Sequence, residues 1–562
     1  MTYEEARTFL DSCNQYAGEF TLEPLKGMLE KLGNPERQLS FVHIAGTNGK
    51  GSVLAFVSTA LKEAGYRVGR YISPTIFSYR ERIQVNEAYI PREDLARLTE
   101  RICAAGQELL AEGKRHPTTF EAETALAFLW FAEQCCDLVV LEVGRGGLKD
   151  ATNVIENTLV AALASISMDH MEFLGSTLGA IAEQKAGIIK PGCTVVSAAQ
   201  QPEAAEVIER ESAAFEAPLV WVQPDEIRNR RRGLLRQSFN YRERTDIEIS
   251  LCGEYQFENA ALALEVLDAL CEKGYKIPEE AVRRGFRSTV WQGRFTVLKE
   301  KPLFLMDGAH NRDAAARLRE SIVNYLPEKR LIFIIGVLKD KEYGELLRQT
   351  APLAAEILTI TPPDNPRALP AAELAREAGK YCSDVCVAES IREAVDTALS
   401  LAGEEDVILA FGSLSWLGKL AREVGLEAGM TAVEKWKETG KYNNFDLHFH
   451  FDRKRESVTF LNAEYIHPLK QDLLQELQTD FEEDQNVRAV IVFGSSVEFR
   501  CNSCSDLDLC IERSDSSRFF HCKSVEPGEK IDIIYADRMG ERLRQEVEKK
   551  GIVVFDREGI YV

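Results

Sequence analysis

Long uninterrupted apolar runs are missing from this 562-residue sequence, because its most apolar stretches are broken by Glu133, Gln134 and Asp137. A helix that crosses a bilayer needs about 20 consecutive apolar residues, so no membrane span is expected. The first residues, MTYEEARTFL, also lack the basic and then apolar pattern of a secretory signal. These two features predict a cytoplasmic protein.

An excess of positive charge is also missing. The chain has 68 Lys and Arg against 89 Asp and Glu, which gives a formal net charge of -21. Nucleic acids and anionic membranes are themselves polyanions, so this balance excludes a broad, sequence-independent attraction to either of them. Any anionic ligand must therefore bind in a local basic pocket.

A disulfide framework is not expected either, since the 13 cysteines are odd in number and scattered along the chain. The one local cluster is Cys501, Cys504, Cys510 and Cys522. Its CxxC start could ligate zinc, but no second CxxC and no paired histidines complete a familiar spacing. Reduced thiols are the preferred interpretation.

Short apolar runs alternate with longer amphipathic segments as far as about residue 420. The apolar runs read SFVHIAG, CDLVVLEVG, LVAALASIS, LIFIIGVL and DVILAFGS. This alternation is typical of parallel strands covered by helices on both faces of a sheet. An α/β architecture is predicted.

Two changes along the chain suggest where its domains meet. A new strand series, FTVLKEKPLFLMDGA, begins after Gln292 and Gly293, and a polar, linker-like stretch follows Gly429. In FDLHFHF the alternation predicts a strand whose other face carries His448 and His450, read as a solvated face rather than a metal site. The predicted parts are a first α/β domain (1–289), a second α/β domain (290–430), a linker and strand segment (431–459) and a C-terminal domain (460–562).

A glycine-rich turn stands between the first apolar run and an amphipathic helix. It consists of Gly46, Thr47, Asn48, Gly49, Lys50, Gly51 and Ser52. Glycines let backbone N–H groups turn toward a phosphate, the helix N-terminus adds positive potential, and the lysine adds a mobile charge. The strict GxxxxGK[ST] pattern fails here, yet the chemistry of the turn is that of a phosphate-binding loop.

The form GTNGKGS resembles the loop of folylpolyglutamate synthase and dihydrofolate synthase, which are relatives of the Mur ligases. Similar segments recur in family order over about three quarters of the chain. They include TLEPLKGMLEKLGNP, YISPTIFSYRERIQVN, TTFEAETALAF, LEVGRGGLKDATNV, SISMDHMEFLGSTLGAIAEQKAGIIKPG, GEYQFENAALAL, WQGRFTVL, MDGAHN, GVLKDK and PPDNPRALP.

This resemblance implies a P-loop, Mur-ligase-like ATP-binding domain followed by a smaller Rossmann-like α/β domain. The implied activity is ATP-dependent addition of L-glutamate to a folate-type acid, which is tetrahydrofolate, dihydropteroate or both, through an acyl phosphate. A monomer with two magnesium ions at the ATP site is expected.

The resemblance also implies roles for individual residues. The first magnesium would be held by Ser73, Glu142 and His170, and a second by Lys185 if that lysine is carbamylated; without carbamylation, Lys185 could neutralise phosphate directly. The implied catalytic residues are Lys50, Lys185 and His170. The residues implied to complete the ATP site, beyond the loop, are Asn259, Arg294, Asp307 and His310. The residues implied to contact dihydropteroate are Phe120, Glu121, Asp150 and Ala151, although Phe120 could equally belong to the core.

The match departs from the family pattern at three places near the expected acid substrate. Thr75 follows Ser73-Pro74 where the family has histidine, the basic residue of GRGGLKD is displaced, and Tyr255 stands where a histidine is usual. These changes leave the ATP and metal residues in place. The identity of the acid is therefore less defined than the class of reaction.

The C-terminal segment RAVIVFGSSVEFRCNSCSDLDLCIE has a glycine-serine turn, Gly494 and Ser495, followed by Asp506 and Asp508 on a strand pattern. Residues two apart on a strand face the same way, and Asp532 of KIDIIYAD could join them. The arrangement resembles the minimal nucleotidyltransferase superfamily, which implies an α+β domain with two magnesium ions and a nucleotide. The acceptor of the nucleotide is not identified, and a protein is one candidate. The alternative interpretation of the aspartates is a solvated acidic strand edge without catalysis.

Two other functions remain open at this point. One is a Mur-type ligase that acts on another acid; the motifs GTNGKGS and DGAHN argue against it. The other is a nucleotide-binding regulatory protein that has lost catalysis; the presence of Lys50, Glu142 and Lys185 argues against that.

Overall fold

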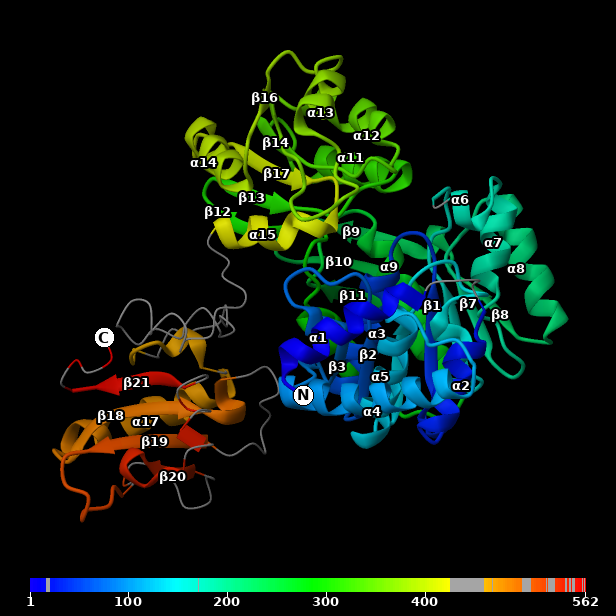
Figure 1. Cartoon of the computed structure of the whole chain (residues 1–562). Coiled ribbons are helices and arrows are strands. Elements are labelled where there is room, and N and C mark those ends of the chain that lie inside the picture. Colours follow the sequence, from blue (N-terminus) through cyan, green and yellow to red (C-terminus); the bar gives the residue numbers. More distant parts are fainter. Residues whose placement is uncertain are drawn as a thin grey trace. The chain divides into compact units, whose positions relative to one another are not determined.

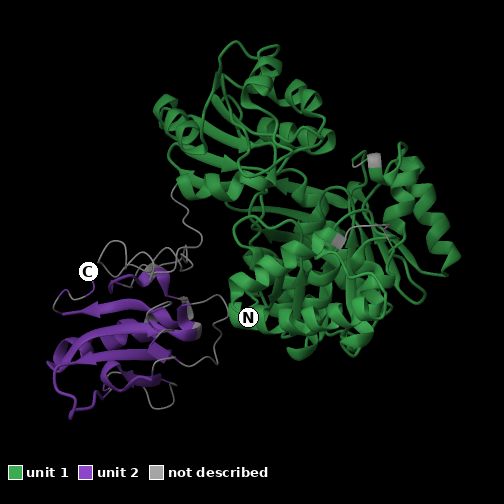
Figure 2. Cartoon of the chain, in the orientation of Figure 1, with its two compact units in different colours: residues 1–424 green, residues 425–562 purple. Residues whose placement is uncertain are grey.

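The computed structural model describes residues 1–16, 21–169, 171–424, 459–466, 468–497, 507–521, 523, 531–540, 543–544, 547, 551–557, 559 and 561. The chain divides into two compact units, Met1–Val424 and Gly425–Val562 (Figure 2). Within the first unit we call residues 1–288 the first lobe, residues 289–295 the connector and residues 296–424 the second lobe. No helix in the described ranges is long and apolar enough to cross a membrane. The predicted strand at FDLHFHF, with His448 and His450, lies outside the described residues.

The first lobe is built on an eight-stranded sheet (Figure 1). Its strands are parallel except for the β3–β4 hairpin at one edge. In sheet order they are β4 (Ala88–Tyr89), β3 (Ile83–Val85), β2 (Val68–Tyr71), β5 (Leu138–Glu142), β1 (Phe41–Ala45), β6 (Thr158–Leu163), β7 (Thr194–Ser197) and β8 (Leu219–Trp221). The central strands β1 and β5 are buried along their whole length, as strands covered on both faces must be.

Helices cover both faces of this sheet. One apolar core is formed with α3 (Lys50–Glu63), α9 (Gln256–Glu272) and α10 (Glu279–Ser288). A second core is formed with α1 (Tyr3–Ser12), α2 (Glu23–Lys31), α4 (Arg92–Ala111) and α5 (Thr119–Glu133). A third core joins β6 and β7 to α7 (Leu178–Ala186) and α8 (Pro202–Ala214).

A small antiparallel sheet packs against α9 and α10. It consists of β9 (Ile227–Arg231), β10 (Gln237–Tyr241) and β11 (Arg244–Ile249). Alternate residues such as Phe239, Tyr241 and Ile247 are buried, while the arginines of β9 face outward. The sequence did not lead us to expect this sheet.

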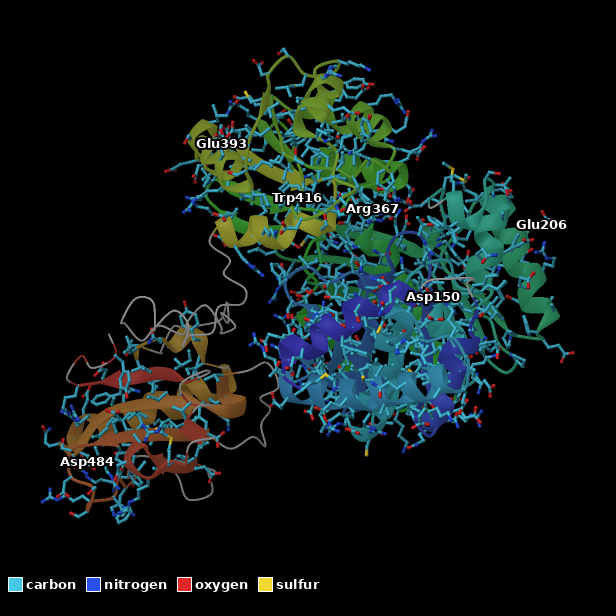
Figure 3. All side chains as sticks on the ribbon, viewed as in Figure 1. Asp150, Glu206, Arg367, Glu393, Trp416 and Asp484 are labelled. Carbon is cyan, nitrogen blue, oxygen red and sulfur yellow. The ribbon has the colours of Figure 1, made fainter. Side chains whose placement is uncertain are left out.

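The second lobe has a six-stranded sheet that is parallel apart from its edge strand β12. In sheet order the strands are β12 (Thr296–Glu300), β13 (Leu303–Met306), β17 (Val407–Phe411), β14 (Leu331–Ile335), β15 (Glu356–Thr359) and β16 (Val385–Val387). One face carries α11 (Arg312–Tyr325), α12 (Tyr343–Thr350) and α13 (Ala371–Ala378), and the other carries α14 (Ile391–Leu401) and α15 (Leu414–Val424). Trp416 of α15 is buried in that second core (Figure 3), where its Nε1 donates to the Gly336 carbonyl at 2.9 Å.

The second unit is an α+β fold with one four-stranded sheet. The sheet order is β20 (Ile531–Tyr535), β19 (Leu507–Arg513), β18 (Val487–Phe493) and β21 (Ile552–Asp556). Leu474, Leu477 and Phe481 of α17 (Pro468–Glu483) pack into its core. The predicted classes, α/β for the first unit and α+β for the second, are confirmed.

Candidate functional site

The glycine-rich turn connects β1 to α3 and is fixed by its neighbours. The N–H of Thr47 donates to the Ser165 carbonyl at 2.7 Å, which ties the turn to the end of β6. Gly49 has φ +88 and caps α3, and a Cβ at this position would lie 2.4 Å from Asn259 Oδ1. A side chain is therefore excluded there both by the backbone and by the contact with α9. The first residues of α3, Lys50, Gly51 and Ser52, line the cleft, and the first N–H groups of a helix have no partner within the helix and can bind an anion.

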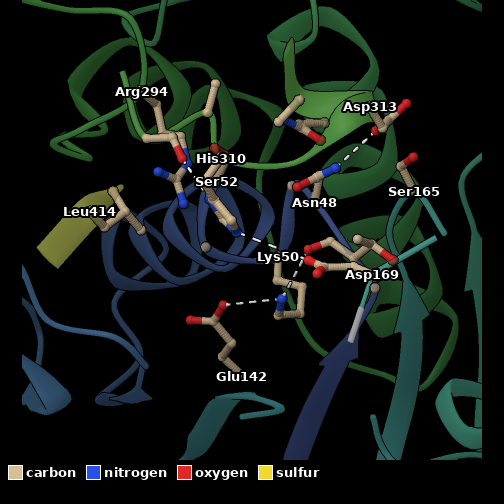
Figure 4. Close-up of a pocket in the computed structure, with 18 of the residues that line it drawn as sticks. Asn48, Lys50, Ser52, Glu142, Ser165, Asp169, Arg294, His310, Asp313 and Leu414 are labelled. Carbon is tan, nitrogen blue, oxygen red and sulfur yellow. Dashed lines mark hydrogen bonds and ion pairs between the residues drawn. The ribbon is translucent and has the colours of Figure 1, made fainter. Parts of the chain in front are cut away.

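Most of the predicted ligase-site residues line one cleft between the two lobes. They are Gly46, Thr47, Asn48, Gly49, Lys50, Gly51, Ser52, Ser73, Glu142, Lys185, Asn259, Arg294, Asp307 and His310. His170 lies outside the described residues. Figure 4 shows Lys50 and Glu142 on the floor of this cleft, with Arg294 and His310 above them.

Glu142 is a buried carboxylate at the end of β5. Its Oε1 lies 3.9 Å from Lys50 Nζ, and its Oε2 accepts the N–H of Ser73 at 3.3 Å (Figure 4). Burial raises the pKa of Glu142, and Lys50 opposes that shift. A carboxylate and a hydroxyl residue that meet at a phosphate loop are hard oxygen donors, so Glu142 and Ser73 fit a magnesium ion.

Lys185 lies on α7 behind the loop. It is buried, and its Nζ donates to the Gly46 carbonyl at 2.8 Å. Burial, and after it the nearby Lys50, lower the pKa of Lys185 to about 7. An amine with a pKa near neutral pH is far less basic than the amine of an exposed lysine.

The connector and the second lobe form the opposite wall. Arg294 Nη1 donates to the Gly293 carbonyl at 2.9 Å, and His310 Nδ1 donates to the Gly308 carbonyl at 2.7 Å. Burial, and after it Lys341, lower the pKa of His310 to about 4. The imidazole is therefore neutral at physiological pH.

Polar contacts across the cleft join the lobes, and apart from Asn48 the sequence did not identify their residues. Asn48 Nδ2 donates to Asp313 Oδ2 at 2.9 Å, as Figure 4 shows. Lys341 Nζ lies 2.9 Å from Asp169 Oδ1, and Asn311 Nδ2 donates to Asp169 Oδ2 at 3.2 Å. Asp169 precedes His170 and Asn311 ends MDGAHN, so their places in those motifs were the available signal.

The predicted dihydropteroate contacts are not among the residues that line the cleft. Glu121 caps α5, because its Oε2 accepts the Thr118 N–H at 2.7 Å, and Phe120 packs against Tyr71 with ring centroids 5.8 Å apart. Asp150, labelled in Figure 3, accepts the Arg145 N–H at 2.8 Å and so supports the loop that does reach the cleft. Ala151 follows it and is buried in the first lobe.

In the second unit, Gly494 has φ +67, and a Cβ there would lie 2.3 Å from Asp508 Oδ2. Asp508 is paired in register with Asp532 on the neighbouring parallel strand. Asp506 and the side chain of Ser495 lie outside the described residues, as do Cys501, Cys504 and Cys522. Among the residues described, no group of three or more His, Cys, Asp or Glu side chains is placed to hold a metal.

Comparison with known families finds matches in both units. Residues 44–267 match the Mur ligase middle domain, and residues 293–414 match the Mur ligase, glutamate ligase domain. Residues 475–559 match polymerase beta, nucleotidyltransferase.

Individual relatives extend over the first unit. The chain is 34% identical over 429 residues to the dihydrofolate synthase/folylpolyglutamate synthase of Bacillus subtilis, covering 75% of this chain and 99% of that protein. It is 31% identical to the folylpolyglutamate synthase of Lacticaseibacillus casei, with 74% and 96% covered. Among solved structures, Mycobacterium tuberculosis folylpolyglutamate synthase complexed with ADP has a TM-score of 0.70 at 30% identity, with 76% and 99% covered.

Proposed function

The chain belongs to the folylpolyglutamate synthase and dihydrofolate synthase family, and we propose that it joins L-glutamate to a folate-type acid at the expense of ATP. Membership of this family confirms the resemblance seen in GTNGKGS and the segments that follow it. The observation that carries the proposal is the cleft in which the loop, Glu142, Lys185 and residues of the second lobe meet. A cleft between two lobes excludes water when it closes, which protects a reactive intermediate.

The reaction forms an amide from an unreactive carboxylate. The carboxylate of the acid attacks the γ-phosphorus of ATP, ADP leaves, and the amino group of glutamate then displaces phosphate from the acyl phosphate. We propose that Lys50 and the N–H groups of the loop bind the phosphates, while Arg294 approaches from the connector. Magnesium, when bound, neutralises charge on the phosphoryl oxygens.

Roles for the remaining residues follow the same proposal. Ser73, Glu142 and His170 would hold one magnesium ion, and Lys185, if carbamylated, a second. Asn259, Asp307 and His310 would complete the nucleotide site, and Phe120, Glu121, Asp150 and Ala151 would support the acid site from behind its loop. We also propose that the chain acts as a monomer in the cytoplasm.

The test offers purified protein ATP, magnesium and glutamate, with dihydropteroate and tetrahydrofolate in parallel reactions. Product mass then shows which acid is used and how many glutamates are added. Phosphate release with neither acid would reject the folate reading and favour a Mur-type ligase for another acid. An ATP site that binds nucleotide without any turnover would favour a regulatory protein.

A second activity is proposed for the second unit, because its sequence matches polymerase beta, nucleotidyltransferase, and Asp508 and Asp532 lie side by side at its glycine turn. We propose that it transfers a nucleotide, with two magnesium ions held by Asp506, Asp508 and Asp532 and the triphosphate at Gly494 and Ser495. The first acceptor to test is a protein, including this chain. Mass analysis after incubation with each nucleoside triphosphate tests it, and equal labelling of the Asp506→Ala, Asp508→Ala double variant would reject these ligands.

A further inference from the structure

One hydrogen bond at the back of the cleft joins the two lobes directly. Tyr255 immediately precedes α9 in the first lobe, and its hydroxyl donates to Asp307 Oδ2 at 2.7 Å. Asp307 follows β13 in the second lobe and is only 3% exposed. Both residues line the cleft. A buried carboxylate needs such partners, since leaving it without them costs several kcal/mol.

Asp307 has two further partners, and both are backbone groups. Its Oδ2 accepts the N–H of Phe295 and its Oδ1 accepts the N–H of Ala309, each at 2.8 Å. Phe295 has φ +47, a left-handed conformation that a side chain disfavours and that surrounding contacts must maintain. The carboxylate of Asp307 is thus one of the contacts that hold the end of the connector in this conformation.

Arg294 immediately precedes Phe295 in this turn. Its neighbour Gly293 also has positive φ, and the Gly293 carbonyl accepts both Arg294 Nη1 and the Gly308 N–H at 2.9 Å. A Cβ on Gly308 would lie 2.2 Å from Arg294 Nη1, so the guanidinium passes directly over that glycine. The direction of the Arg294 side chain therefore depends on the turn that Asp307 holds.

We propose that Tyr255 is a positioning residue for the reaction: by holding Asp307 across the cleft, it fixes the 293–295 turn and aims Arg294 at the phosphates of the nucleotide. The inference rests on the proposed ligase function. It also explains how the chain accommodates a tyrosine where relatives with this motif usually have histidine. Burial, and after it Asp307, raise the pKa of the Tyr255 hydroxyl well above its usual value; Cys252 adds to this shift and Arg294 opposes it. The hydroxyl therefore keeps its proton and remains a hydrogen-bond donor.

The test measures binding of AMPPCP with magnesium to the full-length chain by isothermal titration calorimetry, with Asp506→Ala and Asp508→Ala present in every sample so that the proposed second nucleotide site does not contribute. Tyr255→Phe is expected to weaken binding about tenfold, since it removes a hydrogen bond to a charged group. Tyr255→His restores a donor and is expected to recover most of that loss. In an Arg294→Ala background, Tyr255→Phe is expected to cause less than about a twofold further change, because coupled residues are not additive.

The matched control is Tyr241→Phe. Tyr241 is another buried phenol, and its hydroxyl donates to the Glu265 carboxylate at 2.6 Å. This pair does not line the cleft. Tyr241→Phe should leave AMPPCP binding unchanged. Wild-type affinity in Tyr255→Phe, or an equal loss in the Arg294→Ala background, would overturn the inference while leaving the ligase proposal intact. A wild-type chain that fails to bind AMPPCP would overturn both.

Discussion

Lys50 is the charged side chain that the loop presents to the cleft at the start of α3. Its Nζ lies 3.3 Å from the Thr47 carbonyl and 3.9 Å from Glu142. These contacts hold the ammonium group in place, and the ion pair with Glu142 is too long to neutralise its charge fully. Lys50→Met should lower kcat/KM for ATP by at least about 100-fold, because charge accumulates on the phosphoryl oxygens during transfer. Phosphate release measures the loss.

The control for this prediction is Lys26→Met, which neutralises a lysine paired with Glu23 on the surface of α2. Its rate should match wild type. A loss below about fivefold in Lys50→Met would show that the lysine does not act on the transferred group.

Gly49 is required for a reason that the phosphate-loop pattern alone does not contain. Gly49→Ala places a side chain on a left-handed backbone and brings its Cβ too close to Asn259 Oδ1. It should lower the free energy of unfolding by about 2–3 kcal/mol. Gly33 has a similar φ of +86 with nothing within 4 Å of its missing Cβ. Gly33→Ala should therefore cost only the backbone part, about 1 kcal/mol, in the same urea titration. Equal losses would remove the contact with α9 from the explanation.

Single residues of the cleft were predictable where a motif carried them, as with Lys50, Glu142 and Asp307. Their partners were not. Lys185 bonds a carbonyl 139 residues away and Asn48 bonds Asp313 across the cleft. Contacts of this kind depend on how the lobes pack, which no local pattern encodes. The acid contacts Phe120 and Glu121 stay a prediction: in the structure Phe120 packs against Tyr71 and Glu121 caps α5.

At the scale of elements, the β3–β4 hairpin carries a buried ion-pair cluster. Asn86 and Glu87 form its two-residue turn with positive φ at both positions, and the Glu87 carboxylate contacts Arg70, Lys62 and the Thr59 hydroxyl. Burial alone would raise the pKa of Glu87, but Arg70 and Lys62 outweigh it and lower the pKa to about 2. The ordinary value is 4.5, so the folded state favours the ionised form.

The sign of the resulting pH dependence follows from this shift. The stabilisation by Glu87 is fully present above about pH 4.5, and it is lost as the pH falls toward 2, where the folded state also takes up the proton. Glu87→Gln should lower the free energy of unfolding by about 3 kcal/mol at pH 7, and by progressively less below pH 4.5. Urea titrations at pH 7, 5, 4 and 3 measure the gap. A gap that stays constant with pH would assign the loss to packing.

Buried parallel strands were the elements best predicted by sequence. SFVHIAG, CDLVVLEVG and DVILAFGS became β1, β5 and β17, because strands covered on both faces need continuous apolar runs. The antiparallel sheet β9–β11 was missed for the opposite reason. Its first strand, IRNRR, exposes its arginines and buries few side chains, so its sequence is typical of a loop. The short β3–β4 hairpin likewise offers too few residues for a period-two pattern to emerge.

At the scale of the whole molecule, every described residue that lines the nucleotide cleft belongs to the first unit, Met1–Val424. Each unit also has its own sheets and apolar cores. Units with separate cores unfold as separate cooperative transitions unless a large interface couples them. The thermal unfolding of the full-length chain is therefore expected to show two transitions by scanning calorimetry.

A ligand that binds only one folded unit stabilises only that unit. At about 100 times its dissociation constant, AMPPCP should contribute about 2.7 kcal/mol to the first unit and raise its transition by a few degrees. The second transition should stay in place if its own site binds this analogue weakly, and the Asp506→Ala, Asp508→Ala variant checks that point. In Lys50→Met the shift of the first transition should shrink if the lysine contacts the phosphates as proposed. A shift of both transitions together in that double variant would show that the units are energetically coupled.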